Sequence, residues 1–564
     1  MQKAWWQGKV AYQIYPRSFK DSNGDGIGDL RGIIEKLPYI ASLGVEILYL
    51  NPIFASPGAD NGYDISDYRK INPQFGTLAD LDELIARAKE RGISIILDMV
   101  LSYTSCEHEL FKRALSGRKA PERDFYYFVR GSNGRTPDNL RSFFGGSVWE
   151  RVPGEDDLYY LHYFTKEQPE LNWYNEQLRQ RMSDLINWWL DRGIAGFRLD
   201  AIMNVVKDRT FPGLPPDELG DGSCAAARMN AKLAAQAPSL HQELKKHSYG
   251  PRGAFTVAEA FGLNDTILDQ FIGDEGCFST VFDFTARETI EKNRPGYYAY
   301  PKGTLKIYRD GNFHMQQLTS PLGLVAPILE NHDEPRAVSF YLDEGQQNAQ
   351  GARALGTVFM FLRGIPFIYQ GQELGLTNTR FDSIGEIDDV QSKNEYRNAL
   401  AHGFSKEQAL AILNVHSRDH ARTPLPWDDS PHAGFTTGRP WLKLHQDAQS
   451  LNVAAQEQDP GSVLNYYRAL VALRKRGAWQ ECFCSGDFIP GPTADDHVMH
   501  YLRKGTGKCA EIVGNFSTKE RVFELSGEGR ILLCSIPEAR VEGRRLTLGA
   551  TGAAVVEILP GRSA

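Results

Sequence analysis

Cysteine is scarce in this chain and follows no metal-binding or redox spacing. The 564 residues include seven cysteines, an odd number, and no two of them form a Cys-x-x-Cys pair. A disulfide-stabilised scaffold needs many paired cysteines and a zinc module needs Cys-x-x-Cys spacing, so the sequence argues against both. The nearest pair, Cys482 and Cys484, is interpreted as two residues of a strand.

Long apolar runs and a targeting segment are also missing. No stretch approaches the 18 or so consecutive apolar residues that a transmembrane helix needs. The N-terminus runs through Trp5 and Trp6 into an apolar stretch, without the basic region and cleavage site of a secretory leader. We therefore predict a cytoplasmic protein that has no membrane partner.

Neither sign of charge dominates. The chain carries 63 Lys and Arg against 71 Asp and Glu, for a formal net charge of -8, and has no long single-sign run. A polyanion would be repelled on average, so nucleic acid is not predicted as a partner. With 41% hydrophobic residues, the length suits a soluble globular protein of two or three domains.

What the chain has is a repeated alternation of short apolar runs with amphipathic stretches such as 78–90 and 176–192, which is typical of βα units. Eight such units predict an α/β protein built on a (β/α)8 TIM barrel, whose reactive groups lie at the carboxyl ends of the strands. The eight predicted strands are 10–15, 45–51, 93–101, 194–200, 254–259, 280–284, 324–330 and 366–370.

Two long insertions interrupt this repeat. Residues 102–172, rich in aromatic residues and glycine, predict an inserted domain after the third strand, and about 378–450 a lid-like excursion after the eighth. The barrel domain would then comprise 1–101 and 173–480. Short alternating runs predict a C-terminal antiparallel β-sandwich domain over 481–564.

Three carboxylates follow predicted strands: Asp200, Glu259 and Asp333. In a barrel these ends converge on one mouth. Arg198 and Asp200 lie two residues apart in a strand, so they face the same side, and the arginine should lower the pKa of the aspartate.

Two carboxyl groups in unlike surroundings are what cleavage of a glycosidic bond requires. Asp200 fits the nucleophile. Glu259, with apolar neighbours in the sequence, fits an acid/base of raised pKa. Asp333 would then hold sugar hydroxyls.

In these residues the chain resembles glycoside hydrolase family 13, the α-amylase family, in its oligo-1,6-glucosidase and α-glucosidase branch, from about residue 5 to the C-terminus. The motifs that carry the resemblance are Asn61-Gly62-Tyr63-Asp64, Ile96-Leu97-Asp98, Gln168-Pro169-Glu170-Leu171-Asn172-Trp173, Gly196-Phe197-Arg198-Leu199-Asp200, Glu259, Asn331-His332-Asp333 and Ser417-Arg418-Asp419.

The resemblance implies retaining cleavage of α-glucosidic bonds in small oligosaccharides through a glucosyl-enzyme, by a monomer or homodimer. It assigns the nucleophile to Asp200, the acid/base to Glu259 and transition-state stabilisation to Asp333. It also implies a glucose pocket that includes Asp60, Tyr63, Asp98, Arg198, His332 and Arg418.

A structural Ca²⁺ is the one cofactor predicted. The loop 21–29 offers oxygen at alternate positions, with glycines that permit a tight turn, and the resemblance implies an ion there. The predicted ligands are Asp21, Asn23, Asp25, Ile27 and Asp29. The alternative is a solvated loop of Asx turns.

The sequence departs from the family at Ser102 and Tyr103, which stand where the family has asparagine and histidine. That histidine normally binds the 6-hydroxyl of the glucose. Three explanations compete: the phenol replaces the histidine, the pocket takes a glycon altered near C6, or the enzyme is slow.

The linkage and the acceptor stay open at this stage. A small residue, Ala201, follows the nucleophile, which by analogy with the branch favours α-1,4 or mixed specificity. The alternatives to hydrolysis are transglucosylation and a sucrose- or trehalose-type isomerisation through the same intermediate. A non-catalytic barrel is disfavoured, since all three carboxylates are kept.

Overall fold

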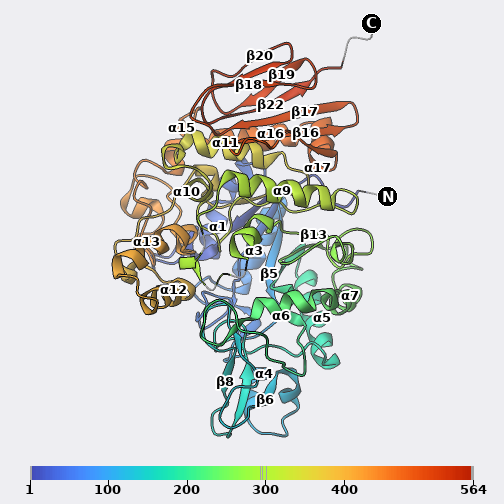
Figure 1. Ribbon diagram of the computed structural model, residues 1–564, viewed down its shortest axis with the longest axis vertical. Helices are drawn as coiled ribbons and strands as arrows, with labels where there is room; N and C mark the ends of the chain where they lie inside the picture. Colours follow the sequence, from blue (N-terminus) through green and yellow to red (C-terminus); the bar gives the residue numbers. More distant parts are fainter. Residues whose placement is uncertain (1–2, 293, 295, 300, 561–564) are drawn as a thin grey trace.

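The computed structural model describes residues 3–292, 294, 296–299 and 301–560, and its centre is a barrel of parallel strands surrounded by helices (Figure 1). Seven strands form one sheet in the order β13-β12-β10-β5-β2-β1-β14, and every pairing is parallel. They are β1 (Ala11–Ile14), β2 (Ile47–Leu50), β5 (Ser94–Val100), β10 (Gly196–Asp200), β12 (Phe255–Ala258), β13 (Thr280–Val281) and β14 (Phe367–Tyr369).

The segment predicted as the seventh barrel strand, 324–330, forms no continuous strand. It closes the barrel through single parallel bridges, from Ala326 to Phe282 on one side and from Ile328 to Phe367 on the other. Pro327 lies between these bridges and has no N–H to donate, so the ladder is interrupted there. Its carbonyl still accepts from the N–H of Phe367 at 3.1 Å.

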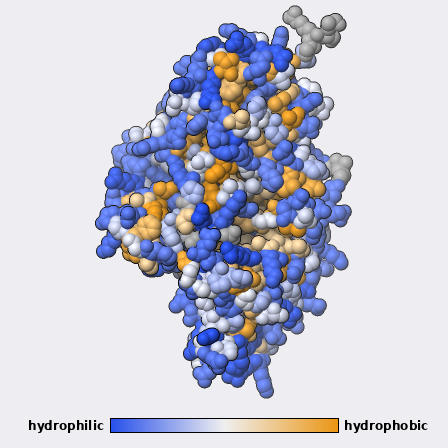
Figure 2. Space-filling model, in the orientation of Figure 1, coloured by the Kyte–Doolittle hydropathy of each residue, from blue (hydrophilic) through white to orange (hydrophobic). Residues whose placement is uncertain are grey.

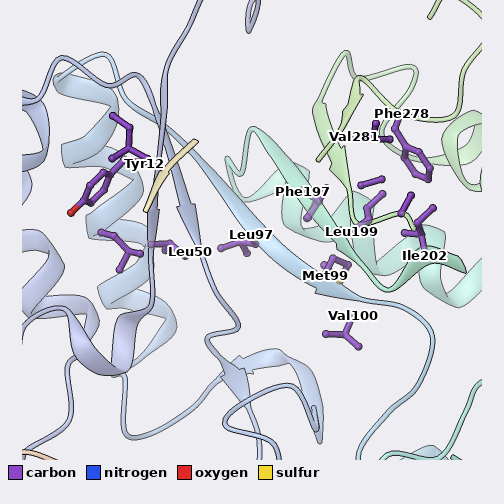
Figure 3. Close-up of a cluster of buried hydrophobic side chains, with 14 of the residues drawn as sticks. Tyr12, Leu50, Leu97, Met99, Val100, Phe197, Leu199, Ile202, Phe278 and Val281 are labelled. Carbon is purple, nitrogen blue, oxygen red and sulfur yellow. The ribbon is translucent and has the colours of Figure 1, made fainter. Parts of the chain in front are cut away.

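Side chains that alternate along the barrel strands face either the apolar core or the site. Leu97 and Met99 of β5, with Phe197 and Leu199 of β10, pack in the large apolar cluster that surrounds the barrel (Figure 3). Because side chains alternate in a strand, the residues next to these four point the other way, into the barrel. They include Asp98, Arg198 and Asp200.

The two amphipathic stretches predicted as helices are confirmed. α3 (Leu78–Glu90) begins at a capping box formed by Thr77 and Asp80. α5 (Glu176–Asp191) begins at Asn175, whose side chain accepts from the N–H of Leu178. Such caps satisfy the free N–H groups of the first turn.

The barrel region contains further helices and two short strands. They are α1 (Leu30–Glu35), α2 (Leu37–Ser42), β3 (Phe54–Ala55), β4 (Asp67–Ile71), α6 (Ala226–Leu233), α7 (Ala237–His247), α8 (Thr285–Glu291), α9 (Leu305–Thr319), α10 (Ala337–Tyr341), α11 (Ala349–Met360), α15 (Val453–Gln458) and α16 (Val463–Arg474).

The two predicted insertions carry structure of their own. After β5 the chain forms α4 (Glu109–Leu115) and a three-stranded antiparallel sheet of β6 (Phe128–Arg130), β9 (Leu158–Leu161) and β8 (Trp149–Arg151). β7 (Leu140–Arg141) pairs instead with β11 (Cys224–Ala225). After β14 come α12 (Val390–Ala401), α13 (Lys406–His416) and α14 (Asp419–Arg422).

The C-terminal part consists of two antiparallel sheets, which lie at the opposite end of the molecule from β6 and β8 (Figure 1). The sheets are β15 (Asp487–Pro490), β16 (Val498–Gly505), β17 (Lys508–Asn515), β22 (Gly552–Ile558) and β19 (Gly529–Cys534), and β18 (Arg521–Glu524), β21 (Arg545–Leu548) and β20 (Arg540–Glu542). The division of the chain into domains stays a prediction.

The interpretation of Cys482 and Cys484 as strand residues is wrong. Both belong to α17 (Ala478–Cys484), where Phe483 between them is also buried. The helix is only seven residues long, which is too short for its apolar spacing to distinguish it from a strand.

No helix within the described ranges is long and apolar enough to cross a membrane. On the face that Figure 2 shows, apolar residues form separate patches among polar side chains.

Candidate active site

β10 places Arg198 at the centre of a buried group of acids. The residue is 3% exposed and lies in register with Asp98 of β5. Its Nη1 atom is 2.8 Å from Oδ1 of Asp98 and 2.5 Å from Oδ1 of Asp200. Its Nη2 atom is 2.9 Å from Oε2 of Glu259. One guanidinium therefore serves three carboxyl groups.

The predicted pKa direction for Asp200 is wrong. Burial raises the pKa of Asp200 well above its usual range, and although Arg198 opposes this, the nearby Glu259 and Asp98 add to it. The side chains of Asp200 and Glu259 both contact the guanidinium of Arg198, so the two carboxyls lie close together.

Glu259 follows β12 and does not have the apolar surroundings predicted for it. Its Oε2 atom accepts from the N–H of Ala201 at 2.8 Å as well as contacting Arg198. Its apolar neighbour Phe261 is instead 37% exposed and stacks on Phe284, with ring centroids 4.7 Å apart. An aromatic pair therefore lies two residues along the chain from the carboxyl of Glu259.

Asp98 anchors the centre of the site. Its Oδ2 atom accepts from the hydroxyls of Tyr49 at 2.6 Å and Tyr63 at 2.8 Å, and its Oδ1 atom faces Arg198. The side chain is fully buried. These contacts suit a residue that positions Arg198.

His332 and Asp333 come from the loop after the segment 324–330. The imidazole of His332 stacks on Tyr63, with centroids 5.5 Å apart and planes at 7°, and its Nε2 atom is also hydrogen-bonded to the Tyr63 hydroxyl. Nε2 lies 3.0 Å from Oδ2 of Asp333. Burial alone would raise the pKa of Asp333, but His332, Arg418 and Arg422 hold it well below its usual range.

Two arginines from the second insertion contact the acids on this side of the site. Nη1 of Arg418 is 3.0 Å and Nη2 of Arg422 is 2.9 Å from Oδ1 of Asp333. Arg418 also lies 3.5 Å from Asp60 and, like Arg422, contacts the fully buried Asp389. Sequence reasoning placed Arg422 in a motif of the second insertion, Ala421-Arg422-Thr423-Pro424, without giving it a role, and missed Asp389, because no strand register shows which side chains of a loop or short helix face the site.

Tyr103 lies directly against Asp200. Its hydroxyl donates to Oδ2 of Asp200 at 3.4 Å, and its ring centroid is 5.1 Å from that of Phe164. The side chain is 1% exposed. The neighbouring Ser102 points elsewhere, and its buried hydroxyl has no hydrogen-bond partner.

Ala201 has a left-handed backbone, with φ 44° and ψ 43°. This conformation is costly for a residue with a Cβ and is typically kept where function depends on it. Here it turns the chain directly after Asp200, so that the N–H of Ala201 points at Glu259.

The predicted calcium loop is a separate cluster, held by its own hydrogen bonds. Oδ1 of Asp21 accepts from the N–H groups of Asn23 and Gly24, and Oδ2 accepts from that of Gly26. Asn23 and Asp25 each accept from the N–H two residues on, while Asp29 caps α1. In the described ranges no group of three or more His, Cys, Asp or Glu residues could hold a metal ion. The alternating Asp, Asn and main-chain oxygens still suit a hard cation, so calcium stays a prediction.

Comparisons with known proteins point to one family. Residues 13–481 match the family model described as alpha amylase, catalytic domain. The chain is 40% identical over 531 residues to probable oligo-1,6-glucosidase 3 of Bacillus subtilis (strain 168), which covers 93% of each chain. It is 37% identical over 565 residues to glucan 1,6-alpha-glucosidase of Streptococcus pneumoniae, which covers 99% of this chain and 100% of that one. A solved variant of the trehalulose synthase MutB in complex with Tris aligns with a TM-score of 0.92 and 36% identity over 99% of this chain and 100% of that chain.

Proposed function

Because this chain belongs to the alpha-amylase family, we propose that it is a retaining, exo-acting α-glucosidase that cleaves short oligosaccharides or α-glucosides. The observation that carries this proposal is the pair of carboxyls, Asp200 and Glu259, held by the two Nη atoms of the single guanidinium of Arg198. Such closeness suits retention, because an inverting pair must leave room for a water molecule between its carboxyl groups.

In the first step a carboxylate oxygen of Asp200 attacks the anomeric carbon. The bond from that carbon to the leaving oxygen breaks, and Glu259 gives its proton to that oxygen. In the second step water attacks the same carbon, Asp200 leaves, and the proton of the water returns to Glu259. This division of roles requires Asp200 to be ionised and Glu259 to be protonated when the sugar is bound.

Exo-action follows from the closed end of the site. Asp60, Tyr103 and Arg418 are 4%, 1% and 7% exposed, whereas the side chain of Asp333 is 30% exposed. A site closed at one end by buried polar groups admits one terminal sugar, whose hydroxyls these groups can bind.

For the glycon, we favour a sugar altered near C6 without added charge. The phenol of Tyr103 contacts Asp200, and the apolar ring of Phe164 lies beside it. No described lysine or arginine contacts either ring within cation–π range, so these two rings offer no cation to an anionic substituent.

The selectivity test compares nitrophenyl α-glucoside, its 6-deoxy analogue and the α-xyloside, in the wild type and in Tyr103→His. The histidine variant should move the ratio of kcat/KM values towards the glucoside. Equal ratios in the two proteins would contradict the assignment.

The second candidate is a transglucosidase or an isomerase of the sucrose or trehalose type. The exposed Phe261, stacked on Phe284 near Glu259, offers a sugar acceptor an apolar face and leaves less room for water. The resemblance to a trehalulose synthase supports the same candidate. The products formed at high substrate concentration distinguish the two candidate activities, because hydrolysis releases free glucose and transfer gives a new disaccharide.

The panel should span α-1,1 to α-1,6 glucosides and sucrose. The small side chain of Ala201, next to the nucleophile, favours α-1,4 or mixed cleavage. Activity confined to α-1,6 bonds would contradict that preference.

The nucleophile is tested with Asp200→Asn, which keeps the shape of the side chain but cannot form the glycosyl-enzyme. We expect kcat to fall by about 10⁴-fold or more, as is typical when a group essential to the covalent step is lost. Asp283→Asn is the matched control, since Asp283 is a buried acid outside the site. Activity retained in Asp200→Asn would place the nucleophile elsewhere.

Calcium binding at Asp21, Asn23, Asp25, the carbonyl of Ile27 and Asp29 is a separate proposal. A bound ion would stabilise the fold by mass action and take no part in the bond cleavage. Chelation should lower the Tm of the wild type but not that of Asp25→Ala. Equal shifts of the Tm in both proteins would contradict calcium binding and indicate that the loop is a set of Asx turns.

A further inference from the structure

The hydroxyl of Tyr103 touches the reacting carboxyl itself, and this gives it a part in the chemistry. We propose that it donates a hydrogen bond to Oδ2 of Asp200 and stabilises this carboxylate when it leaves the sugar in the second step. The inference rests on the proposed function, in which Asp200 is the nucleophile.

The two oxygens of Asp200 have different partners. Oδ1 is 2.5 Å from Nη1 of Arg198, whereas Oδ2 faces the hydroxyl of Tyr103 at 3.4 Å. Arg198 also contacts two other carboxyls, because the same Nη1 atom contacts Asp98 and its Nη2 atom contacts Glu259. The charge of Arg198 is therefore shared among three carboxyls, and a second hydrogen-bond donor, on Oδ2, stabilises the Asp200 carboxylate further.

The phenol is held in place by its surroundings. The backbone of Tyr103 forms an antiparallel bridge with Glu170, its carbonyl accepts from the hydroxyl of Tyr68 at 2.9 Å, and its ring packs on Phe164. Burial, together with the charges of Asp200, Asp60 and Glu170, raises the pKa of Tyr103 well above its usual range. The hydroxyl thus keeps its proton and can only act as a donor towards a carboxylate.

A donor on Oδ2 acts oppositely on the two steps. In the first, Asp200 loses its negative charge as its oxygen bonds to the anomeric carbon, so the hydrogen bond weakens. In the second, water attacks that carbon, the bond to Asp200 breaks with its electron pair returning to the carboxylate, and the hydrogen bond strengthens. The hydroxyl therefore lowers the barrier to release and not the barrier to attack.

The test is Tyr103→Phe, assayed on a nitrophenyl α-glucoside, whose good leaving group makes release of the glycosyl-enzyme rate-limiting. We expect kcat to fall about tenfold, as is typical for a hydrogen bond to a charged group. Because the hydrogen bond does not assist attack, kcat/KM should not fall, and KM should fall with kcat. More glycosyl-enzyme should accumulate than in the wild type, measured by mass as enzyme heavier by one glycosyl group.

Tyr126→Phe is the matched control. Tyr126 is another buried phenol on the same inserted segment, bonded to Thr104 and not to Asp200. It should accumulate no more glycosyl-enzyme than the wild type and keep an unchanged ratio of kcat to kcat/KM. A parallel fall of kcat and kcat/KM in Tyr103→Phe would overturn the inference.

The α-xyloside separates this role from glycon selectivity. A hydroxyl that acts on Asp200 gives the same tenfold loss of kcat with the xyloside as with the glucoside. A loss confined to the glucoside assigns the hydroxyl to the sugar and overturns the inference, while the proposed function stands. Failure of the proposed function is seen separately, as activity retained in Asp200→Asn.

A second variant keeps the inference testable if Tyr103→Phe does not fold. Incorporation of 3-fluorotyrosine at position 103 preserves the shape of the side chain and makes its hydroxyl a stronger donor. We expect kcat to rise with this substitution. An unchanged or lower kcat would count against the hydroxyl.

Discussion

Asp60 is an acid of the site whose charge changes close to neutral pH. Burial raises the pKa of Asp60 to about 7, although Arg418 and Arg422 oppose the shift. Below this pH the carboxyl is protonated, and above it the carboxylate accepts stronger hydrogen bonds from sugar hydroxyls. KM should therefore fall as pH rises through about 7.

The comparison uses Asp60→Asn, which should show a KM that no longer depends on pH in this range. Glu395→Gln is the control, because burial also raises the pKa of Glu395 to about 7, but its carboxyl accepts from the N–H of Tyr297 and contacts none of the catalytic acids directly. If Glu395→Gln, and not Asp60→Asn, removes the dependence, the assignment to Asp60 is wrong.

For single residues, the sequence predicts which side chains lie in the site better than it predicts their pKa values. Asp98, Arg198 and Asp200 could be found because strands alternate and parallel strands end together. Asp389 and Arg422 could not, because their position depends on how a long excursion folds back. The pKa direction of Asp200 was also out of reach, since burial outweighs the adjacent arginine only once the chain is folded.

Among the elements, the loop after β10 is tied to the first insertion by a buried ion pair. Nζ of Lys207 lies 2.9 Å from Oε2 of Glu170, and both side chains are at most 1% exposed. The backbone of Glu170 pairs with Tyr103, so the ion pair also supports the site.

We expect Lys207→Met to lower the free energy of unfolding by about 3–5 kcal/mol, because it leaves Glu170 buried without a counter-charge. Adding Glu170→Gln should recover part of this loss. Lys306→Met is the control, since its pair with Asp310 is exposed and should contribute little to stability. Urea denaturation measures these variants together with Glu170→Gln and the wild type, and strictly additive losses for the double variant would contradict the coupling.

Strand prediction failed where one residue type overrides the pattern. The apolar run 324–330 looks like the other barrel strands, yet Pro327 breaks the ladder and leaves only bridges. The helix that ends at Cys484 was missed for a different reason, since seven residues are too few for their apolar spacing to distinguish a helix from a strand.

For the whole molecule, the C-terminal sheets share their core with the barrel. Phe488, Met499 and Tyr501 belong to the same apolar cluster as the residues of α11 and α16, and the Tyr501 hydroxyl donates to the carbonyl of Val358 at 2.7 Å. The sequence indicates where βα units give way to alternating strands, but it does not show that the two parts share one apolar core.

Heating should therefore unfold the protein in one cooperative transition, because neither part buries its apolar surface alone. Differential scanning calorimetry checks this, and two separate transitions would contradict it. A chain that ends at residue 484 should be insoluble, whereas Tyr501→Phe, which removes one hydrogen bond, should only lower the Tm by a few degrees.

The sharing of Arg198 has a consequence for which ligands the site attracts. Three guanidiniums, on Arg198, Arg418 and Arg422, are linked by ion pairs to six carboxyls, on Asp60, Asp98, Asp200, Glu259, Asp333 and Asp389. The site therefore holds twice as many carboxyls as guanidiniums. We expect this excess of acidic groups to favour protonated amino sugars over phosphorylated sugars as ligands.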